Sequence, residues 1–321
     1  MIHGTACKDV SEARCLKATH TSASRPTCSY MCKPGDMPGN MSVAITAADG
    51  FVAPWIAEML GEDAIIVPDE ALMEPLVLDA MLTPCKSLIH INSTVSDGLL
   101  GRDDRETMLK MRERSRPVLD AVGRHGGLHL MLVGTLRVHP QWEEGEPYYG
   151  SDSTIAPRDV AAEAQLWMEE MSLEQATPER PVSVIRASNV QGVPINGPPG
   201  NGLLHKWAEE SPIGWINVPG DGSDFKDFVH VQDLVECIMR CLSDPPPTRE
   251  SIAVGSGKGI QLSELAQIYT QMTGCENEFG QQVEQEVFGI VDASEIEMRL
   301  GFRPAISLEE MIREALEAAS Q

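Results

Sequence analysis

The segment Ser42-Val-Ala-Ile-Thr-Ala-Ala-Asp-Gly-Phe-Val-Ala53 decides the fold of this chain. An apolar run leads into a glycine-containing turn and then into the amphipathic stretch 54–60, which predicts a buried strand, a tight turn and a helix. Such a βα unit binds a pyrophosphate when glycines let the backbone approach it and the first helical N–H groups face its charge. Of the three expected glycines only Gly50 is present, because Ala47 and Ala53 stand at the outer positions.

The rest of the chain repeats this alternation of short apolar runs and helical periods. Further strands are predicted at 64–67, 87–91, 128–133 and 181–186, and helices at 72–82, 102–124 and 156–174. Strands separated by helices predict an α/β fold, a Rossmann-type doubly wound parallel sheet with helices on both faces. From about residue 189 glycine- and proline-rich loops and shorter elements predict a smaller C-terminal lobe. The expected parts are therefore 1–40, a nucleotide-binding domain at 41–188, and a lobe at 189–321.

Composition and charge narrow the class of protein. The 321 residues are 42% hydrophobic and 23% charged, which suits a globular chain with a full core. A net charge of −23 disfavours binding to nucleic acid or to an anionic membrane, because both surfaces carry the same sign. No apolar stretch approaches the roughly 20 residues that cross a bilayer. We therefore expect a soluble, cytoplasmic protein.

The first forty residues are rich in Ser, Thr, Cys and Pro and have no apolar period, so we expect a disordered extension. Asp9, Glu12 and Asp36 interrupt the basic pattern of a transit peptide. A zinc site built from Cys28, Cys32 and His20 is conceivable. The paired CxxC knuckles that would support it are missing, and we predict no metal.

Six segments in the same order resemble the motifs of the extended short-chain dehydrogenase/reductases, the NAD-dependent epimerase/dehydratase family. The resemblance runs from about Met41 to the C-terminus. Thr46–Ala53 is similar to the family's TGxxGFxG turn, Leu88–His90 to its strand ending in histidine, and Val133–His139 to its active-site strand. Arg186–Gly192 is similar to RxxNVYG, Pro219–Asp233 to GDGxxxRDFxHVxD, and Asp292–Pro304 to DxSKxxxxLGxxP.

The resemblance implies a cofactor site at the first turn and at the ends of the neighbouring strands. Its expected residues are Ala47, Asp49, Gly50, Phe51, Val52, Asp69, His90 and Asn92. Asp69 is spaced to bind the ribose 2′-hydroxyl, which favours NAD over NADP. Between Asp69 and the His90 strand there is room for one helix, where the family usually has a further βα passage. We therefore expect a shallow adenine side.

In the family a Ser or Thr, a Tyr and a Lys carry out the redox chemistry. Thr135 occupies the Ser/Thr position, although its hydroxyl could equally cap the end of a strand. The sequence Ala161-Ala-Glu163 anchors the register of the YxxxK motif and places Ile155 at the tyrosine and Asp159 at the lysine. Isoleucine transfers no proton, and a carboxylate would raise the pKa of a nearby phenol rather than lower it.

A displaced tyrosine is the alternative. Tyr149-Gly-Ser-Asp-Ser resembles the start of the motif in a slipped register, and a loop rearrangement could bring Tyr149 to Thr135. Otherwise Tyr148 and Tyr149 are expected to form an exposed pair in a loop. His139 stands where the family has a tyrosine, and we assign it no proton transfer.

On the substrate side the resemblance places Asn189 and Lys226 near the diphosphate of a nucleotide sugar. Lys226 replaces the arginine of many members and loses its bidentate fork. Asp221 and Asp233 are expected to hold loops and a helix start. His205 and His230 are expected to be structural.

Two functions of different classes follow. In one, the chain is an active NAD-dependent epimerase, dehydratase or reductase of a nucleotide sugar that uses Thr135 and Tyr149. In the other, it is redox-inert and kept as a nucleotide or nucleotide-sugar binding module, which the loss of both proton-transfer residues favours, because general acid–base catalysis contributes about 10²–10⁴-fold. An RNA-binding role would need a basic groove, and the net charge of −23 argues against it. The resemblance also predicts a homodimer through helices 102–124 and 156–174.

Overall fold

The computed structural model describes residues 42–46, 50–91, 105–142, 146, 148–195, 202–281 and 289–320. These ranges all belong to one compact unit, Cys32–Gln321. Three expected cofactor residues, Ala47, Asp49 and Asn92, lie outside the described residues, as do the extension 1–40 and its candidate zinc ligands.

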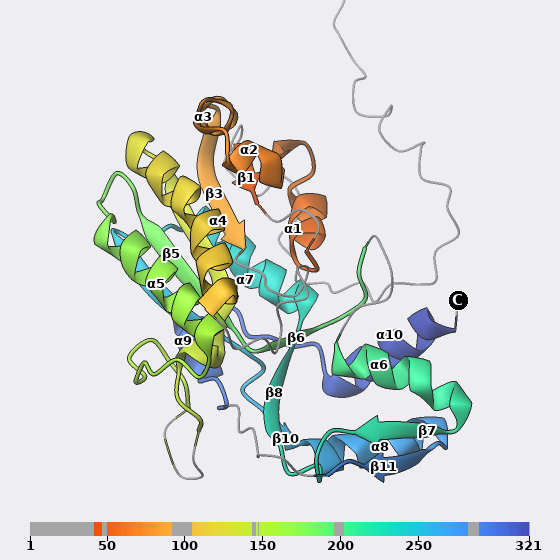
Figure 1. Ribbon diagram of the computed structural model, residues 1–321. Coiled ribbons are helices and arrows are strands. Elements are labelled where there is room, and N and C mark those ends of the chain that lie inside the picture. The colour runs from red at the N-terminus through yellow and green to blue at the C-terminus, as the bar shows by residue number, and fades with distance from the viewer. Residues whose placement is uncertain are drawn as a thin grey trace, which may run out of the picture. The chain divides into compact units, whose positions relative to one another are not determined.

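A parallel sheet of six strands forms the centre of the fold (Figure 1). Its strands, in the order β2-β1-β3-β4-β5-β9, are β2 (Ala64–Ile66), β1 (Ser42–Ile45), β3 (Cys85–Ile91), β4 (His129–Thr135), β5 (Val182–Ala187) and β9 (Arg249–Val254). Every neighbouring pair is parallel. The predicted Rossmann-type α/β fold is confirmed.

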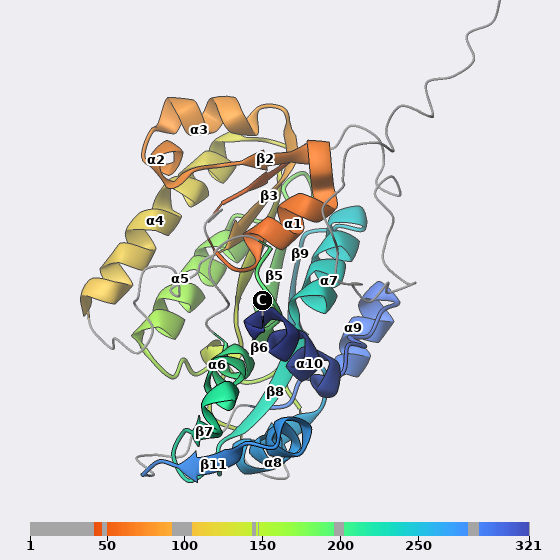
Figure 2. The ribbon, with the colours of Figure 1, turned by 90° about the vertical axis from the view of Figure 1, so that its right-hand side faces the viewer.

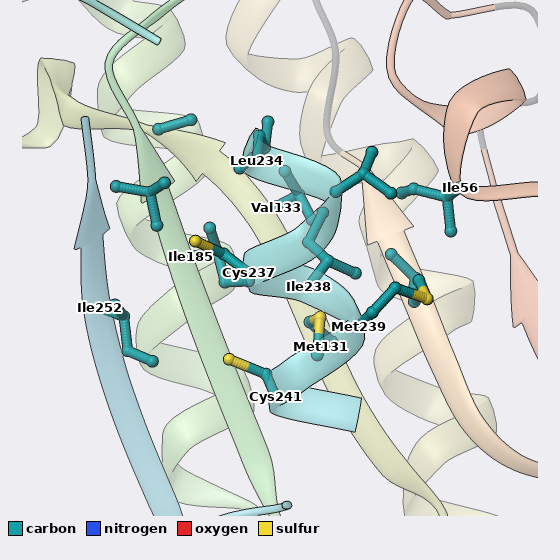
Figure 3. Close-up of a cluster of buried hydrophobic side chains, with 14 of the residues drawn as sticks. Ile56, Met131, Val133, Ile185, Leu234, Cys237, Ile238, Met239, Cys241 and Ile252 are labelled. Carbon is teal, nitrogen blue, oxygen red and sulfur yellow. The ribbon is translucent and has the colours of Figure 1, made fainter. Parts of the chain in front are cut away.

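Helices cover both faces of this sheet, because successive side chains of a strand point to opposite faces. On one face α1 (Ala53–Leu60), α7 (Val231–Ser243) and α9 (Ala293–Leu300) pack on the strands. Figure 3 shows α7 there, with Leu234, Cys237, Ile238 and Cys241 over β4, β5 and β9. The other face is covered by α2 (Asp69–Leu72), α3 (Pro75–Leu82), α4 (Arg105–Arg124) and α5 (Val160–Glu174) (Figure 2).

The sheet is short on one side. Beyond β1 it holds the single strand β2, and the chain then returns through α2 and α3 to β3 on the other side of β1. The predicted helix 72–82 is divided, because Pro75 starts a new helix and leaves Met73 and Glu74 as the turn between α2 and α3. The further βα passage expected from the family is therefore missing from this edge.

The C-terminal part adds a smaller lobe with its own core. It contains a sheet in the order β10-β8-β6 and a pair β11-β7. The strands are β6 (Asn189–Gln191), β7 (Trp215–Val218), β8 (Phe225–His230), β10 (Gly259–Gln261) and β11 (Glu276–Phe279). The helices are α6 (Leu203–Glu210), α8 (Leu262–Thr273) and α10 (Leu308–Ala319). Trp207 and Tyr269 are fully buried between them, with ring centroids 5.5 Å apart.

Three single turns of 3-10 helix, η1 (Gly61–Asp63), η2 (Leu136–Val138) and η3 (Ser211–Ile213), complete the elements of the described ranges. Within those ranges, none of the helices combines the length and the apolar character that a membrane span needs.

Candidate functional site

The carboxyl ends of β1 and β3 meet at a buried polar pair. The hydroxyl of Thr46 accepts a hydrogen bond from the amide of Ile91 at 3.3 Å and lies 2.8 Å from Nδ1 of His90. The hydroxyl can donate to Nδ1 or accept from it, so the direction of this bond depends on which ring nitrogen of His90 carries the proton. Burial lowers the pKa of His90 to about 4, so the ring is neutral. Across the described ranges Nε2 has no hydrogen-bond partner, although His90 is only 3% exposed.

The turn between β1 and α1 presents a helix N-terminus without a side-chain cap. Gly50 and Phe51 lead to Val52, the N-cap residue, whose side chain offers no acceptor to the first amides of α1. The first turn of α1 contains no acidic residue. Uncapped amides and the positive end of the helix dipole suit an anion. This end of the site, with the unpartnered Nε2 of His90 at the end of β3, offers polar groups to a pyrophosphate.

The adenosine side fits a dinucleotide less well. Asp69, the expected ribose ligand, begins α2 and forms an ion pair with Arg114 of α4, with 2.8 Å between Oδ2 and Nη2. Both side chains are solvent-accessible, so the pair can exchange for other partners. On this side of β1 the sheet holds the single strand β2, without the further βα passage that the family usually has.

Asp159 and Ile155, the residues expected at the family's lysine and tyrosine positions, lie at and before the start of α5. Asp159 is the N-cap of α5, where Oδ1 accepts from the amide of Ala162 at 2.7 Å and Oδ2 pairs with Nε of Arg137 at 2.5 Å. The cap makes α5 begin at Val160, four residues later than predicted. Ile155 lies in the extended segment before the helix and is 37% exposed. Ile155 has no ionisable group, and both oxygens of the Asp159 carboxylate are engaged within the chain.

Thr135 ends β4 at the expected place. Its Oγ1 accepts from the amide of Arg137 at 3.2 Å and so caps the 3-10 turn η2. The hydroxyl of Thr135 therefore caps the end of the strand, which was one of its two expected roles.

Tyr149 is buried, so the expectation of an exposed pair was wrong for this residue. It is 4% exposed, whereas Tyr148 is 49% exposed. The backbone of Tyr149 is tied to a distant segment, since its amide donates to Ile290 at 2.7 Å and its carbonyl accepts from Asp292 at 2.9 Å. These bonds pull the ring inward, a contact that no local sequence pattern reveals.

The hydroxyl of Tyr149 is fully engaged. It donates to the carbonyl oxygen of Pro140 and accepts from Nη2 of Arg158 at 3.1 Å. Burial raises the pKa of Tyr149, and the nearby Arg158 guanidinium offsets only part of that rise. The phenol is therefore a neutral, satisfied group.

A buried network continues from this ring to β5. The ring of His139 stacks on Tyr149, with centroids 4.9 Å apart, and donates from Nδ1 to the carbonyl of Thr154 at 2.8 Å. Its Nε2 then accepts from Arg186 at 3.4 Å, and Nη2 and Nε of Arg186 both donate to Oε2 of Glu169, at 2.8 and 3.0 Å. Burial and the two nearby arginines lower the pKa of His139 to about 4.

Sequence reasoning missed the charged members of this network, Arg158, Glu169 and Arg186. A signal was available for Arg186, because a charged residue inside the apolar run of β5 must be paired when it is buried. The identity of its partner on α5 was not readable from spacing.

On the lobe side, Asn189 donates from Nδ2 to the carbonyl oxygen of Asp227 at 2.9 Å. The buried Asp227 carboxylate accepts from the amides of Ser256, Gly257 and Val291 and fixes two loops. Lys226 lies on β8 opposite Ile260. The structure thus gives Asn189 a structural bond and leaves the ligand role of Lys226 a prediction.

The polar residues predicted to be structural lie in a loop, at the start of α7 or on α6. Asp221 accepts from Ser223, Asp233 accepts from the amides of Ala305 and Ile306, and Nε2 of His230 lies 2.6 Å from Glu314. His205 is buried on α6. Within the described residues no group of three His, Cys, Asp or Glu side chains is arranged to hold a metal ion.

No protein-family model matches the sequence. Among curated proteins, the chain is 27% identical over 106 residues to a probable GDP-L-fucose synthase 1 of Oryza sativa subsp. japonica, an alignment that covers 32% of each chain. It is 30% identical over 97 residues to GDP-L-fucose synthase 1 of Arabidopsis thaliana, which covers 29% of each. The matched segment thus spans about a third of these curated relatives.

Similarity to solved structures covers nearly the whole fold. UDP-glucuronic acid 4-epimerase from Bacillus cereus, in complex with UDP-glucuronic acid and NAD, matches with a TM-score of 0.72 at 15% identity over 87% of this chain and 99% of that one. UDP-glucose-4-epimerase from Stenotrophomonas maltophila with bound NAD gives 0.74 at 15% identity over 87% and 98%. RMD from Pseudomonas aeruginosa complexed with NADPH gives 0.72 at 19% identity over 87% and 97%. The chain has the fold of the extended short-chain dehydrogenase/reductases.

Proposed function

We propose that this chain is a member of the NAD-dependent epimerase/dehydratase family that binds a dinucleotide and a nucleotide-sugar-like ligand but lacks the family's tyrosine-dependent hydride chemistry. One observation supports the proposed lack of hydride chemistry. The candidate tyrosine, Tyr149, is enclosed, with its hydroxyl bound to Pro140 and Arg158 and its pKa raised by burial. A proton carrier must reach the substrate before its pKa matters.

The binding half rests on the residues at the sheet edge. The uncapped start of α1 would hold the pyrophosphate, and Nε2 of His90 would donate to it in the tautomer that carries the ring proton there. NAD, when bound, supplies a hydride acceptor. Asp69 would meet the ribose, a role that favours NAD over NADP, once its ion pair with Arg114 exchanges. The missing strand beside β2 makes weak binding at the adenosine end the expected result.

The proposed loss of hydride chemistry follows from the residues that stand at the positions of the family's tyrosine and lysine. With Ile155 at the tyrosine position and Asp159 committed to capping α5, these two positions of the family's motif supply neither a phenol nor a cation. A loss of about 10²–10⁴-fold in rate is expected from the general acid–base step alone. The fold would then serve as a binding module.

An active enzyme is the second candidate, and one observation favours it. Arg158 places a guanidinium 3.1 Å from the phenol oxygen of Tyr149, the kind of neighbour that a proton-transfer tyrosine needs. In that alternative a rearranged loop would bring Tyr149 to Thr135. The cost is the loss of the Tyr149 backbone bonds to Ile290 and Asp292.

The ligand class comes from the similar proteins. The curated relatives are named for GDP-L-fucose synthesis, and a solved structure of the same fold holds UDP-glucuronic acid with NAD. A nucleotide sugar is therefore the ligand we propose, with Lys226 as the charge near its diphosphate. Its base and sugar stay undefined.

Calorimetric titration of the full chain with NAD, NADH and NADPH tests the binding half. The matched variants are Val52→Asp and Val52→Asn, which both offer a cap to α1 but differ by one negative charge beside the proposed pyrophosphate. We expect NAD and NADH to bind the parent chain and Val52→Asn, and to bind Val52→Asp at least about tenfold more weakly. Equal binding by both variants, or no binding by the parent chain, would contradict the proposed site.

The chemical half is tested by following nicotinamide absorbance with GDP- and UDP-sugars. We expect no sugar-dependent turnover in the parent chain. Turnover that disappears in Tyr149→Phe, while NADH binding stays unchanged, would establish the active alternative instead.

A further inference from the structure

The outer edge of β2 is open. β2 is the last strand of the central sheet, on the side where the family usually has a further βα passage, and it pairs with β1 alone (Figure 2). The amide of Val67 donates to the carbonyl oxygen of Ile45 at 2.8 Å, so Ile65, two residues earlier, also turns its backbone groups towards β1. Ile66 therefore turns its N–H and C=O away from the sheet, and neither forms a hydrogen bond within the described ranges. A strand edge of this kind can pair with another strand.

Apolar side chains are exposed on both faces of this edge. Ile66 is 39% exposed, and it shares a face with Ala64, which packs against the core under α1. On the other face, Val77 of α3 is 47% exposed. Asp79 faces α4, where it pairs with Arg124, and Val77 stands about 200° away around the helix, on the side of β2. A further strand would cover apolar surface on both faces of the sheet.

The charge around this edge has one sign. Between Phe51 and Cys85 the chain carries no Lys, Arg or His and seven acidic side chains: Glu58, Glu62, Asp63, Asp69, Glu70, Glu74 and Asp79. Asp69 and Asp79 pair with arginines of α4. Glu62 and Asp63 come directly before β2 and Glu70 follows it, and none of these three forms an ion pair with a described residue. Both ends of the open strand are therefore acidic.

We infer that the outer edge of β2 binds an extended, basic segment of a partner protein, which joins the central sheet as an additional strand. The N–H and C=O of Ile66 would bond to the backbone of this segment. Its alternate side chains would cover Ile66 on one face and Val77 on the other, and its Lys or Arg residues would meet the acidic flanks. Acidic residues stand at both ends of β2, so a parallel and an antiparallel segment are equally well matched in charge.

The charge also decides against the other occupants of such an edge. Two copies of this chain joined edge to edge through β2 would bring their acidic flanks together, which is unfavourable. An acidic segment would be repelled in the same way. The open edge thus selects a basic partner while it resists self-association, the usual hazard of an unpaired strand.

Fluorescence anisotropy of the full chain with a labelled synthetic peptide, in which Lys and Val alternate, tests this docking site. We expect saturable binding at micromolar concentration. Two matched peptides separate the causes. One carries N-methyl groups on every second residue and so keeps the charge but loses backbone donors, and the other has Glu in place of Lys. Both should bind at least about tenfold more weakly.

Variants of the chain locate the contact. Ile66→Pro removes the outward N–H without removing a bond to β1, and proline is tolerated at such an edge. We expect this variant to bind the Lys-Val peptide at least about tenfold more weakly. Glu62→Lys and Glu70→Lys should each weaken binding about threefold. The control is Glu317→Lys on α10, which changes an exposed charge elsewhere and should bind like the parent chain.

Hydrogen exchange in the parent chain gives a readout that does not depend on the folding of any variant. The amide of Ile66 should exchange more slowly when the Lys-Val peptide is bound, whereas that of Ile65, already bonded towards β1, should change little. Unchanged exchange at Ile66, equal affinity for the methylated and unmethylated peptides, or a loss of binding in Glu317→Lys would overturn the proposal. So would sedimentation that showed the parent chain dimeric and Ile66→Pro monomeric, because a second copy would then occupy the edge.

Discussion

The Arg158 guanidinium lies 3.1 Å from the hydroxyl oxygen of Tyr149, and in this chain the contact satisfies a neutral phenol. The same side chain donates to the carbonyls of His139 at 2.9 Å and Pro140 at 2.7 Å, so it holds the loop that encloses the ring. A cation beside a tyrosine usually suggests an activated acid or base. Here the burial of the phenol outweighs the cation, and the result is a structural pair.

Replacing Arg158 with Gln should therefore raise the pKa of Tyr149 further, because the guanidinium is the largest influence that lowers it. The variant should also lose about 2–3 kcal/mol of stability with its three hydrogen bonds. Ultraviolet titration of tyrosinate measures the first effect, with Tyr149→Phe identifying the signal of this residue. Ionisation of Tyr149 near neutral pH in the parent chain would mean that the ring is an activated group after all.

Three buried histidines should make the protein sensitive to acid. Burial lowers the pKa values of His90, His129 and His139 to about 4, below the usual 6.5. The unfolded chain therefore binds these protons first, so their contribution to stability is complete above about pH 6.5 and is lost as the pH falls towards 4. Each shift corresponds to an upper limit of about 3 kcal/mol.

Denaturant unfolding measured at several pH values checks this expectation. The pH dependence should correspond to the uptake of up to about three protons on unfolding between pH 6.5 and 4. The variant His129→Asn should take up about one proton fewer. Stability that is constant through this window would show that the rings are not held neutral.

The sequence alone predicted the strands whose own residues are mostly apolar and buried. The runs before Thr46 and around His90 and Val133 are mainly apolar, as is usual for strands covered on both faces, and the central strands were found within a few residues of their bounds. Helix starts were less predictable, because Asp159 ends the extended segment and caps α5 where periodicity alone continues back to residue 156.

The candidate site was harder to predict because long-range contacts decide it. Tyr149 was expected in an exposed loop, yet its backbone bonds to Ile290 and Asp292 bury it. Asp69 was expected to be free for a ribose, but Arg114, 45 residues later, pairs with it. The proposal that Ile155 and Asp159 replace the family's Tyr and Lys rests on residue type, whereas the contacts of Asp159 with Ala162 and Arg137 required coordinates.

Asp159 should be needed for stability and not for chemistry. We expect Asp159→Ala to lose about 1–2 kcal/mol, since it removes the cap of α5 and the pair with Arg137. Asp159→Asn keeps a capping side chain and should lose less than half of that. Urea unfolding compares the two variants. Equal losses would show that the charge, and not the cap, is what matters at this position.

The pair Asp69–Arg114 should set the preference between the two dinucleotides, an expectation that rests on the proposed cofactor site. With 2.8 Å between the charged groups, Arg114 offsets the repulsion that Asp69 would exert on the 2′-phosphate of NADPH. We expect Arg114→Gln to bind NADPH about tenfold more weakly while NADH changes less than about threefold. Lys206→Gln on α6 removes a comparable exposed charge elsewhere and serves as the control in the same calorimetric titration. An equal loss of both dinucleotides in Arg114→Gln would place Arg114 on the common part of the ligand, away from the ribose.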